Sequence, residues 1–199
     1  MSSGKRKIAD ILIESALIVF GILLGLYLQG LATKRDTNSK KQLALSRIIT
    51  EISHNKDVVA EALQRHMHIV DRVNNADSMR EYLTQNPFDV RRVLHAQPLY
   101  KVYPRATSWN AAAASGIVSE FDFTSLELLT DNYALQQKVI DQVDIVADII
   151  LTSTTKDSNI TLRNLSMNMQ ELAGRERLLL MNYERILQQI PSDGNQEMD

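Results

Sequence analysis

Three of the four histidines, His54, His66 and His68, occur at spacings that raise the question of metal binding. Glu51 and His54 form a Glu-x-x-His pair, which di-iron helix bundles supply twice, together with two further glutamates. The chain has no second such pair, so we interpret Glu51 and His54 as part of a solvated helix face. His66 and His68 are two residues apart and would point about 200° apart on a helix, so they cannot share a metal. His66 falls in an apolar stripe and is expected to be buried or interfacial.

Other signatures of catalysis are missing from the sequence. The chain has no cysteine and none of the G-x-S-x-G, H-E-x-x-H, Walker A or G-x-G-x-x-G patterns. Asp141, Asp144 and Asp148 share one helix face, but a helix provides no flexible oxygen cage for calcium, so we expect a solvated acidic face. These observations predict a protein that is not an enzyme and that has no cofactor or metal.

Residues 90–119 form a basic insert in an otherwise acidic soluble region. The insert has a charge of +4 and no acidic residue, whereas residues 42–89 and 120–199 have 11 basic and 21 acidic residues, a charge of −10. Cations interleaved with aromatic residues suit an anionic ligand or lipid headgroups, and electrostatic docking of the insert on the acidic helices is the favoured alternative. Nucleic acid is not an expected partner of so acidic a domain. The candidate contacts are Arg91, Arg92, Tyr100, Lys101, Tyr103 and Arg105.

The N-terminal region predicts a membrane span. No charged residue occurs from Ser15 to Thr33, and about 20 apolar helical residues cross a bilayer. We predict a basic flank at 1–7 and a transmembrane helix at 8–32. The alternative is a signal peptide with small residues at Gly30 and Ala32, but the apolar stretch is too long for one and Glu14 interrupts it. We expect a single-pass protein of the plasma (inner) membrane, with a cytoplasmic N-terminus and the soluble domain outside.

One face of the predicted span carries small and polar residues. Glu14, Gly21, Gly25 and Gln29 follow one another at separations of seven, four and four positions and therefore share a face. Small residues let helices approach closely, so this face predicts helix association in the bilayer. An acid within a membrane helix also suggests a third function, that of a small oligomeric pore.

The rest of the chain predicts an all-α soluble domain at 33–190. Apolar residues recur by three and four in three long segments, 39–75, 124–152 and 158–190, in a pattern typical of a helical bundle or coiled coil. We expect an antiparallel bundle of three long helices after the transmembrane helix, an insert of short helices at 76–123 and an acidic tail at 191–199.

Three of the four prolines break up the insert: Pro87, Pro98 and Pro104. Short helices are expected at 78–84, 89–96 and 109–115, the last capped by Ser108 and ended by Gly116.

The second long helix carries a local start signal. Residues 124–127 (Thr-Ser-Leu-Glu) match a capping box, and Phe123 with Leu128 would form the matching hydrophobic staple. We therefore predict that the helix begins at Thr124.

Three patches of the chain, in this order, resemble a family of small bacterial single-pass membrane proteins classified as a domain of unknown function. The patches are 14–26 (an acid followed by an apolar run with glycine), 51–55 (Glu-Ile-Ser-His-Asn), and Trp109 with Ser115, Gly116, Leu126, Leu129 and Tyr133. At the membrane exit the chain has Gln29-Gly30-Leu31, where the family usually has Asn-Trp. The resemblance implies a membrane span with a helical soluble domain, and a structural corner at Trp109, Ser115 and Gly116. It implies no activity.

The expected function is that of a membrane-anchored scaffold or accessory subunit, which self-associates or docks on another membrane protein. Its partners are then the lipid bilayer and either a second copy or another membrane protein. The alternative is a membrane-tethered sensor that binds an anionic ligand at the basic insert.

Overall fold

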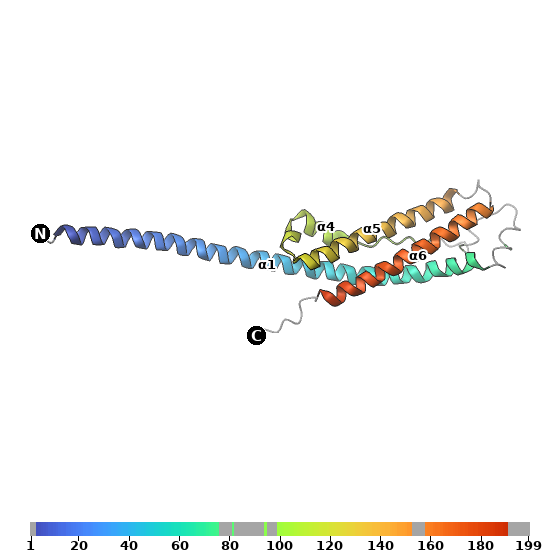
Figure 1. Cartoon of the computed structure of the whole chain (residues 1–199), viewed down its shortest axis with the longest axis horizontal. Coiled ribbons are helices and arrows are strands. Elements are labelled where there is room, and N and C mark those ends of the chain that lie inside the picture. Colours follow the sequence, from blue (N-terminus) through green and yellow to red (C-terminus); the bar gives the residue numbers. More distant parts are fainter. Residues whose placement is uncertain (1–2, 76–80, 82–93, 95–98, 153–157, 191–199) are drawn as a thin grey trace. The chain divides into compact units, whose positions relative to one another are not determined.

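The regular structure of the protein is helical throughout the described residues. The computed structural model describes residues 3–75, 81, 94, 99–152 and 158–190 (Figure 1). The elements are α1 (Ser3–Asn74), α4 (Thr107–Ala114), the 3-10 helix η1 (Ile117–Glu120), α5 (Phe123–Thr152) and α6 (Ser158–Gln189). This confirms the expected all-α class. The expected short helices at 78–84 and 89–96 lie outside the described residues, apart from Glu81 and Leu94.

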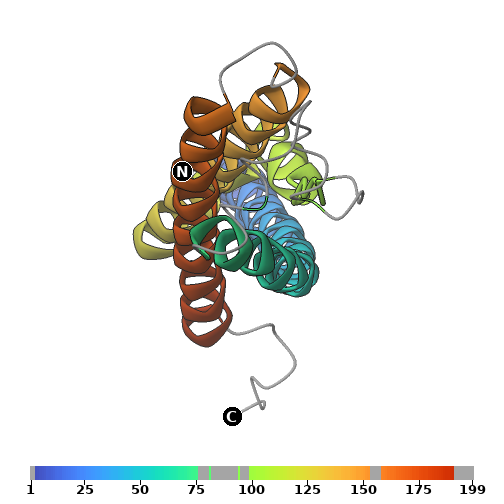
Figure 2. The ribbon, with the colours of Figure 1, turned by 90° about the vertical axis from the view of Figure 1, so that its right-hand side faces the viewer.

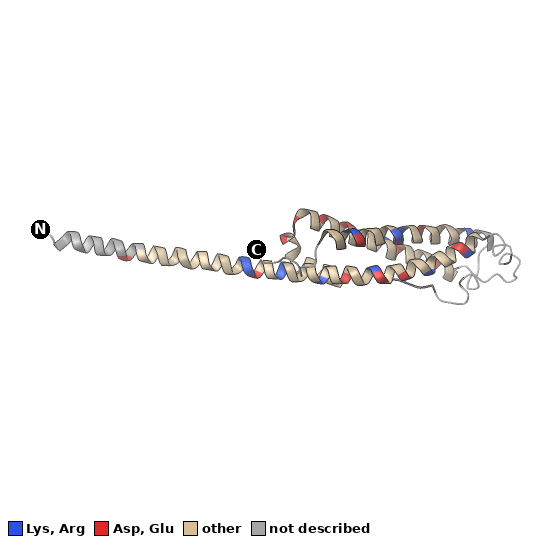
Figure 3. Cartoon of the chain, turned by 90° about the horizontal axis from the view of Figure 1, so that it is seen from below, with Lys and Arg blue, Asp and Glu red and all other residues tan. Residues whose placement is uncertain are grey.

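The first of two compact units comprises Met1–Leu43. In it, α1 contains one stretch that is long and apolar enough to be a candidate membrane span. Large apolar side chains here are exposed, from 64% at Leu17 to 40% at Leu31. Figure 3 shows no charged residue on this stretch between Glu14 and Lys34.

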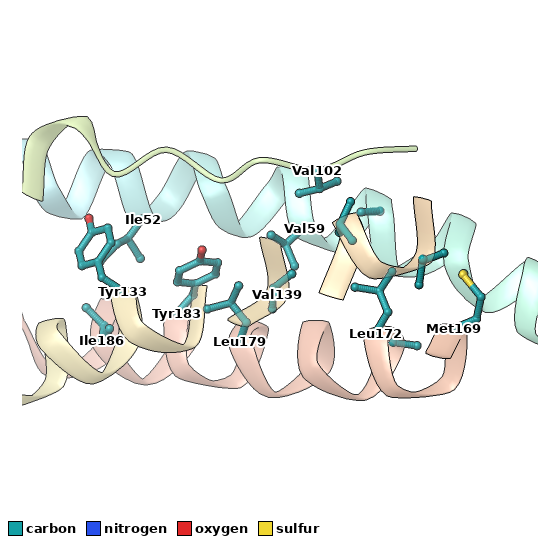
Figure 4. Packing of buried hydrophobic residues seen from close by; sticks show 14 of the residues in the cluster. Ile52, Val59, Val102, Tyr133, Val139, Met169, Leu172, Leu179, Tyr183 and Ile186 are labelled. Carbon is teal, nitrogen blue, oxygen red and sulfur yellow. The ribbon is translucent and has the colours of Figure 1, made fainter. Parts of the chain in front are cut away.

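The second unit, Ala44–Asp199, has its core between α5, α6 and the part of α1 that belongs to this unit (Figures 1 and 2). Ile52 and Val59 of α1 are fully buried, as are Val139 of α5 and Leu172 of α6 (Figure 4). These apolar side chains recur by three and four along each helix, so each helix presents a continuous stripe to the other two. Val102, from the extended segment before α4, also joins this core.

Hydrogen bonds between the helices show that α6 runs antiparallel to the other two. Along α1, His66 contacts Glu176 and the later residue Asn74 contacts the earlier residue Ser166. The same descending order relates α5 to α6, where the hydrogen-bonded pairs are Gln136–Tyr183 and Gln142–Asn168. The expected antiparallel arrangement is therefore found for α6 relative to α1 and α5.

Helices α1 and α5 run parallel in the second unit. Glu51 accepts a hydrogen bond from Tyr133, and Asn55, one turn later, contacts Gln136, one turn later on α5. The chain can repeat the direction because the segment 99–106 returns along α1 before α4 begins: Tyr100 contacts His66 and Arg105 contacts Asn55, so five residues span eleven helical positions and the segment is extended. The antiparallel expectation thus does not extend to α1 and α5.

The start of α5 differs from the predicted capping box. The helix begins at Phe123, and the carboxylate of Asp122 accepts the backbone N–H of Ser125 at 2.9 Å. Asp122 therefore acts as the N-cap, two residues before Thr124. Phe123 is 79% exposed, so the predicted staple with Leu128 is wrong. An aspartate in the N-cap position satisfies an orphan helix N–H, which leaves Thr124 inside the first turn.

Candidate functional site

The extended segment 99–106 is held between α1 and α5 by buried amide side chains. Asn55 pairs with the backbone of Arg105 on both sides: its Nδ2 donates to the carbonyl at 2.7 Å and its Oδ1 accepts the N–H at 2.8 Å. Gln136 donates to the carbonyls of Pro104 and Arg105, at 3.1 and 3.0 Å. Its Oε1 accepts from the hydroxyl of Tyr183 at 2.8 Å. The backbone carbonyl of Pro104 and both backbone polar groups of Arg105 thereby have partners, although this segment has no secondary structure.

Glu51 joins three helices through one carboxylate. Its Oε1 accepts the hydroxyl of Tyr133 of α5 at 2.8 Å, and its Oε2 accepts the backbone N–H of Ser108, in the first turn of α4, at 2.8 Å. Burial, together with the negative charge of Glu51, raises the pKa of Tyr133 and of Tyr183 above the ordinary value of 10. Both phenols therefore stay neutral and donate their hydrogen bonds.

A second buried cluster centres on His66 and Glu176, both with no exposed side-chain surface. Nδ1 of His66 lies 2.8 Å from a carboxylate oxygen of Glu176, and Nε2 donates to the carbonyl of Tyr100 at 3.0 Å. Because a carbonyl can only accept, Nε2 carries one proton, and a second proton is shared between Nδ1 and the carboxyl group. Burial raises the pKa of Glu176, while the hydrogen bond and the charge of His66 oppose that shift. His66 is thus buried, as expected from its place in the apolar stripe.

The three residues of the expected structural corner lie at the two ends of α4. The ring of Trp109 stacks on that of Tyr133, with 5.1 Å between centroids and 13° between planes. At the far end, the hydroxyl of Ser115 donates to the carbonyl of Ala112, and Gly116 has a φ of 75°. A left-handed residue is the usual way to end a helix, and glycine adopts it without strain. The helix itself begins at Thr107 rather than at the expected Trp109, and Ser108 does not cap it.

Three of the four described candidate contacts of the basic insert, Tyr100, Lys101 and Tyr103, contact acidic residues of α1 and α5. Lys101 lies 4.0 Å from Asp144, whose carboxylate also accepts the hydroxyl of Tyr103 at 3.1 Å. The hydroxyl of Tyr100 donates to Glu61 at 3.4 Å, and the guanidinium of Arg65 lies 4.3 Å above the Tyr100 ring. These are contacts that electrostatic docking of the insert would make. Arg91 and Arg92 lie outside the described residues.

The side chain of Arg105 is exposed and lines an open cavity instead. This cavity, which we call the Arg47–Arg105 cavity, has a volume of about 550 Å³ and lies between α1 and the start of α4. It is lined by Ser46, Arg47, Thr50, Glu51, His54, Arg105, Thr107 and Ser108.

The two residues of the Glu-x-x-His pair differ in their surroundings. Glu51 is buried, which corrects the expected solvated face, and His54 is exposed.

The predicted association face of the span consists of exposed side chains and open glycines. Glu14 and Gln29 are exposed, and a Cβ added at Gly21 or Gly25 would meet no atom within 4 Å. Neither glycine therefore contacts another part of the described chain. The face is free for an intermolecular contact, but its residues make no interaction with one another that defines a site.

The acidic face of α5 is a possible calcium site by its residue types, but the sequence predicts that it is solvated. Asp141, Asp144 and Asp148 are exposed on α5, as predicted for a solvated face. Within the described residues, no three His, Cys, Asp or Glu side chains come together in a way that could hold a metal ion.

The sequence pattern does not predict that buried polar side chains such as Asn55, Gln136 and Glu176 form hydrogen bonds between the helices. Gln136 and Glu176 occupy positions in the apolar stripes, and a polar residue at such a position is the one signal that points to a buried hydrogen bond. Asn132 and Thr161 are also buried, and their side-chain polar atoms have no hydrogen-bond partner among the described residues.

No known protein family, curated protein sequence or solved structure matches this chain.

Proposed function

We propose that this chain is a membrane-anchored helical scaffold, which acts by binding through self-association or by docking on another membrane protein. The observation that carries the proposal is the apolar exterior of α1 from Leu17 to Leu31, whose large apolar side chains are exposed. An apolar surface of this length needs either lipid or another protein around it.

The face with Gly21 and Gly25 gives this anchor a means of self-association. Both glycines expose bare backbone with open space beside it, which allows a second helix to approach closely. Glu14 and Gln29 lie on the same face, where their polar groups can find partners away from lipid. Phe20 and Leu23 lie on the opposite face, where they are exposed and suit contact with acyl chains.

Energy transfer between labelled full-length chains in bilayers tests the self-association. Gly21→Ile and Gly25→Ile each fill the space that the second helix needs, so we expect transfer to decrease. Phe20→Leu and Leu23→Ile are controls on the opposite face and are expected to leave transfer unchanged. Equal transfer in all four variants would contradict association through this face.

The proposed location is the plasma (inner) membrane, with the N-terminus in the cytoplasm and the soluble domain outside. Because the chain has no native cysteine, a single introduced cysteine reports its own side of the membrane without background. Ser119→Cys, exposed in the second unit, should react with a membrane-impermeant maleimide on intact cells. Labelling only after lysis would reverse the orientation. Recovery of a soluble chain that begins at Thr33 would instead identify a cleaved signal peptide.

A further inference from the structure

The Arg47–Arg105 cavity is positively charged. The guanidinium groups of Arg47 and Arg105 have no acidic partner among the described residues, whereas Arg65 forms an ion pair with Glu61 on its own helix. Glu51 is the only acid in the lining. Its two oxygens accept hydrogen bonds from Tyr133 and Ser108, and it forms no ion pair with either guanidinium among the described residues. The two arginines therefore outweigh the one carboxylate.

The cavity wall is also held in place by three buried polar side chains, those of Glu51, Asn55 and Gln136. Asn55 fixes both the N–H and the carbonyl of Arg105, and Gln136 binds the same carbonyl. Glu51 fixes the backbone of Ser108. Three buried residues of α1 and α5 thus fix the backbone of the segment that carries Arg105, while the side chain of Arg105 stays exposed. A site built on a fixed backbone loses less entropy when it binds a ligand.

The rest of the lining consists mainly of groups that can donate hydrogen bonds to an oxyanion. Four hydroxyl groups and one imidazole line the cavity: Ser46, Thr50, His54, Thr107 and Ser108. Arginine binds the oxygens of a phosphate group in a bidentate manner, and hydroxyl groups complete such sites. The volume of about 550 Å³ lies within the range of small-molecule sites, so it accommodates a phosphate group with a small body attached.

We propose that the Arg47–Arg105 cavity binds a phosphate group, with the two guanidinium groups as its main contacts. The same chemistry is offered by a soluble phosphate compound and by the headgroup of an anionic phospholipid. Membrane association of the chain makes both sources available, and the experiment has one arm for each.

Thermal unfolding of the full-length chain in a nonionic detergent tests the proposal. In one arm inorganic phosphate is titrated against chloride at matched ionic strength, and in the other the probe is dihexanoyl phosphatidic acid below its micelle concentration. A ligand that binds only the folded state raises Tm as its concentration rises. In Arg47→Gln and Arg105→Gln, we expect the apparent affinity to fall by about tenfold or more, since each variant loses charge-assisted hydrogen bonds.

Arg163→Gln is the matched control, because Arg163 is an exposed arginine of α6 outside the cavity lining. It should bind as the native chain does. A response to both probes identifies a phosphate site open to soluble ligands, and a response to phosphatidic acid alone identifies a lipid headgroup site. The proposal is overturned if neither probe raises Tm, or if both cavity variants retain the full response.

Discussion

Residues 17–31 and 48–73 belong to the same helix, α1, but their apolar side chains have opposite environments. In the first segment large apolar side chains are exposed all around the helix, as at Ile22, which is 58% exposed. In the second they recur by three and four and face inward, as at Ile52, which is fully buried. The two segments differ because polar residues alternate with the apolar residues in the second segment, whereas the first segment consists almost entirely of apolar residues. The second segment can therefore fold against its own chain, whereas the first requires lipid or a partner.

One acidic residue from each unit shows the same contrast. Glu14 is exposed in the first unit, whereas Glu51 is buried in the second unit and accepts two hydrogen bonds. Burying a carboxylate is costly unless it is paired, so Glu51 and Glu176 are stable only because Tyr133, Ser108 and His66 surround them. The bundle thus contains polar contacts that fix which helices meet and in which register.

Loss of the buried histidine–glutamate pair should have the largest effect. Glu176→Leu leaves His66 buried without its acidic partner, so we expect the free energy of unfolding to fall by about 3–5 kcal/mol. Denaturant unfolding of the full-length chain, followed by circular dichroism, measures it. The double variant His66→Leu with Glu176→Leu should lose less than the sum of the single losses. Glu14→Leu is the control in the first unit, and an equal loss there would remove the distinction between the units.

Substitution of one isoleucine in each segment of α1 compares a buried with an exposed apolar side chain. Ile52→Ala should lower the free energy of unfolding by about 2–5 kcal/mol, because it removes a buried side chain and leaves a cavity. Ile22→Ala should leave the free energy of unfolding of the bundle unchanged, because the side chain of Ile22 is exposed. Both are measured by denaturant unfolding. A similar loss at Ile22 would mean that the first segment also packs on the chain.

Local sequence signals predict the long helices closely, because those helices follow from periodicity. The expected 124–152 and 158–190 correspond to the observed Phe123–Thr152 and Ser158–Gln189. The predicted start of α5 is misplaced, because Asp122 and Thr124 are both acceptable N-caps and only the backbone geometry decides between them. The parallel order of α1 and α5 escapes prediction for a different reason: helix patterns do not encode the path of the intervening segment.

The candidate site depends on contacts between residues far apart in the chain. The sequence assigns Glu51 to a solvated face because the chain has no second Glu-x-x-His pair, but its partners, Ser108 and Tyr133, lie 57 and 82 positions away. No spacing within one helix reveals such a pair. The patches that carry the family resemblance include Glu51, Asn55, Trp109 and Tyr133. The structure brings these together around the start of α4.

Alkaline pH should loosen the bundle while leaving the anchor in place. Burial raises the pKa of Tyr133 and of Tyr183, so above about pH 10 the unfolded chain releases phenol protons that the folded chain keeps. Stability is full below that pH and falls as pH rises, by about 1.4 kcal/mol per pH unit for each tyrosine. Tyr183→Phe should reduce the slope by that amount in denaturant titrations, and an unchanged slope would contradict it. Carbonate-washed membranes should retain the chain.

The smallest expected effect concerns the cap of α5. Asp122→Ala removes the carboxylate that accepts the N–H of Ser125, so the free energy of unfolding should fall by about 1 kcal/mol. Thr124→Ala is the matched control: it should change stability by less than about 0.5 kcal/mol, because Thr124 is an exposed residue of the first turn. Chemical unfolding of both variants, side by side, resolves a difference of this size. If Thr124→Ala costs more than Asp122→Ala, the helix starts in solution at the capping box that the sequence suggests. Neither variant should alter membrane association, because the cap lies in the second unit and the apolar exterior in the first.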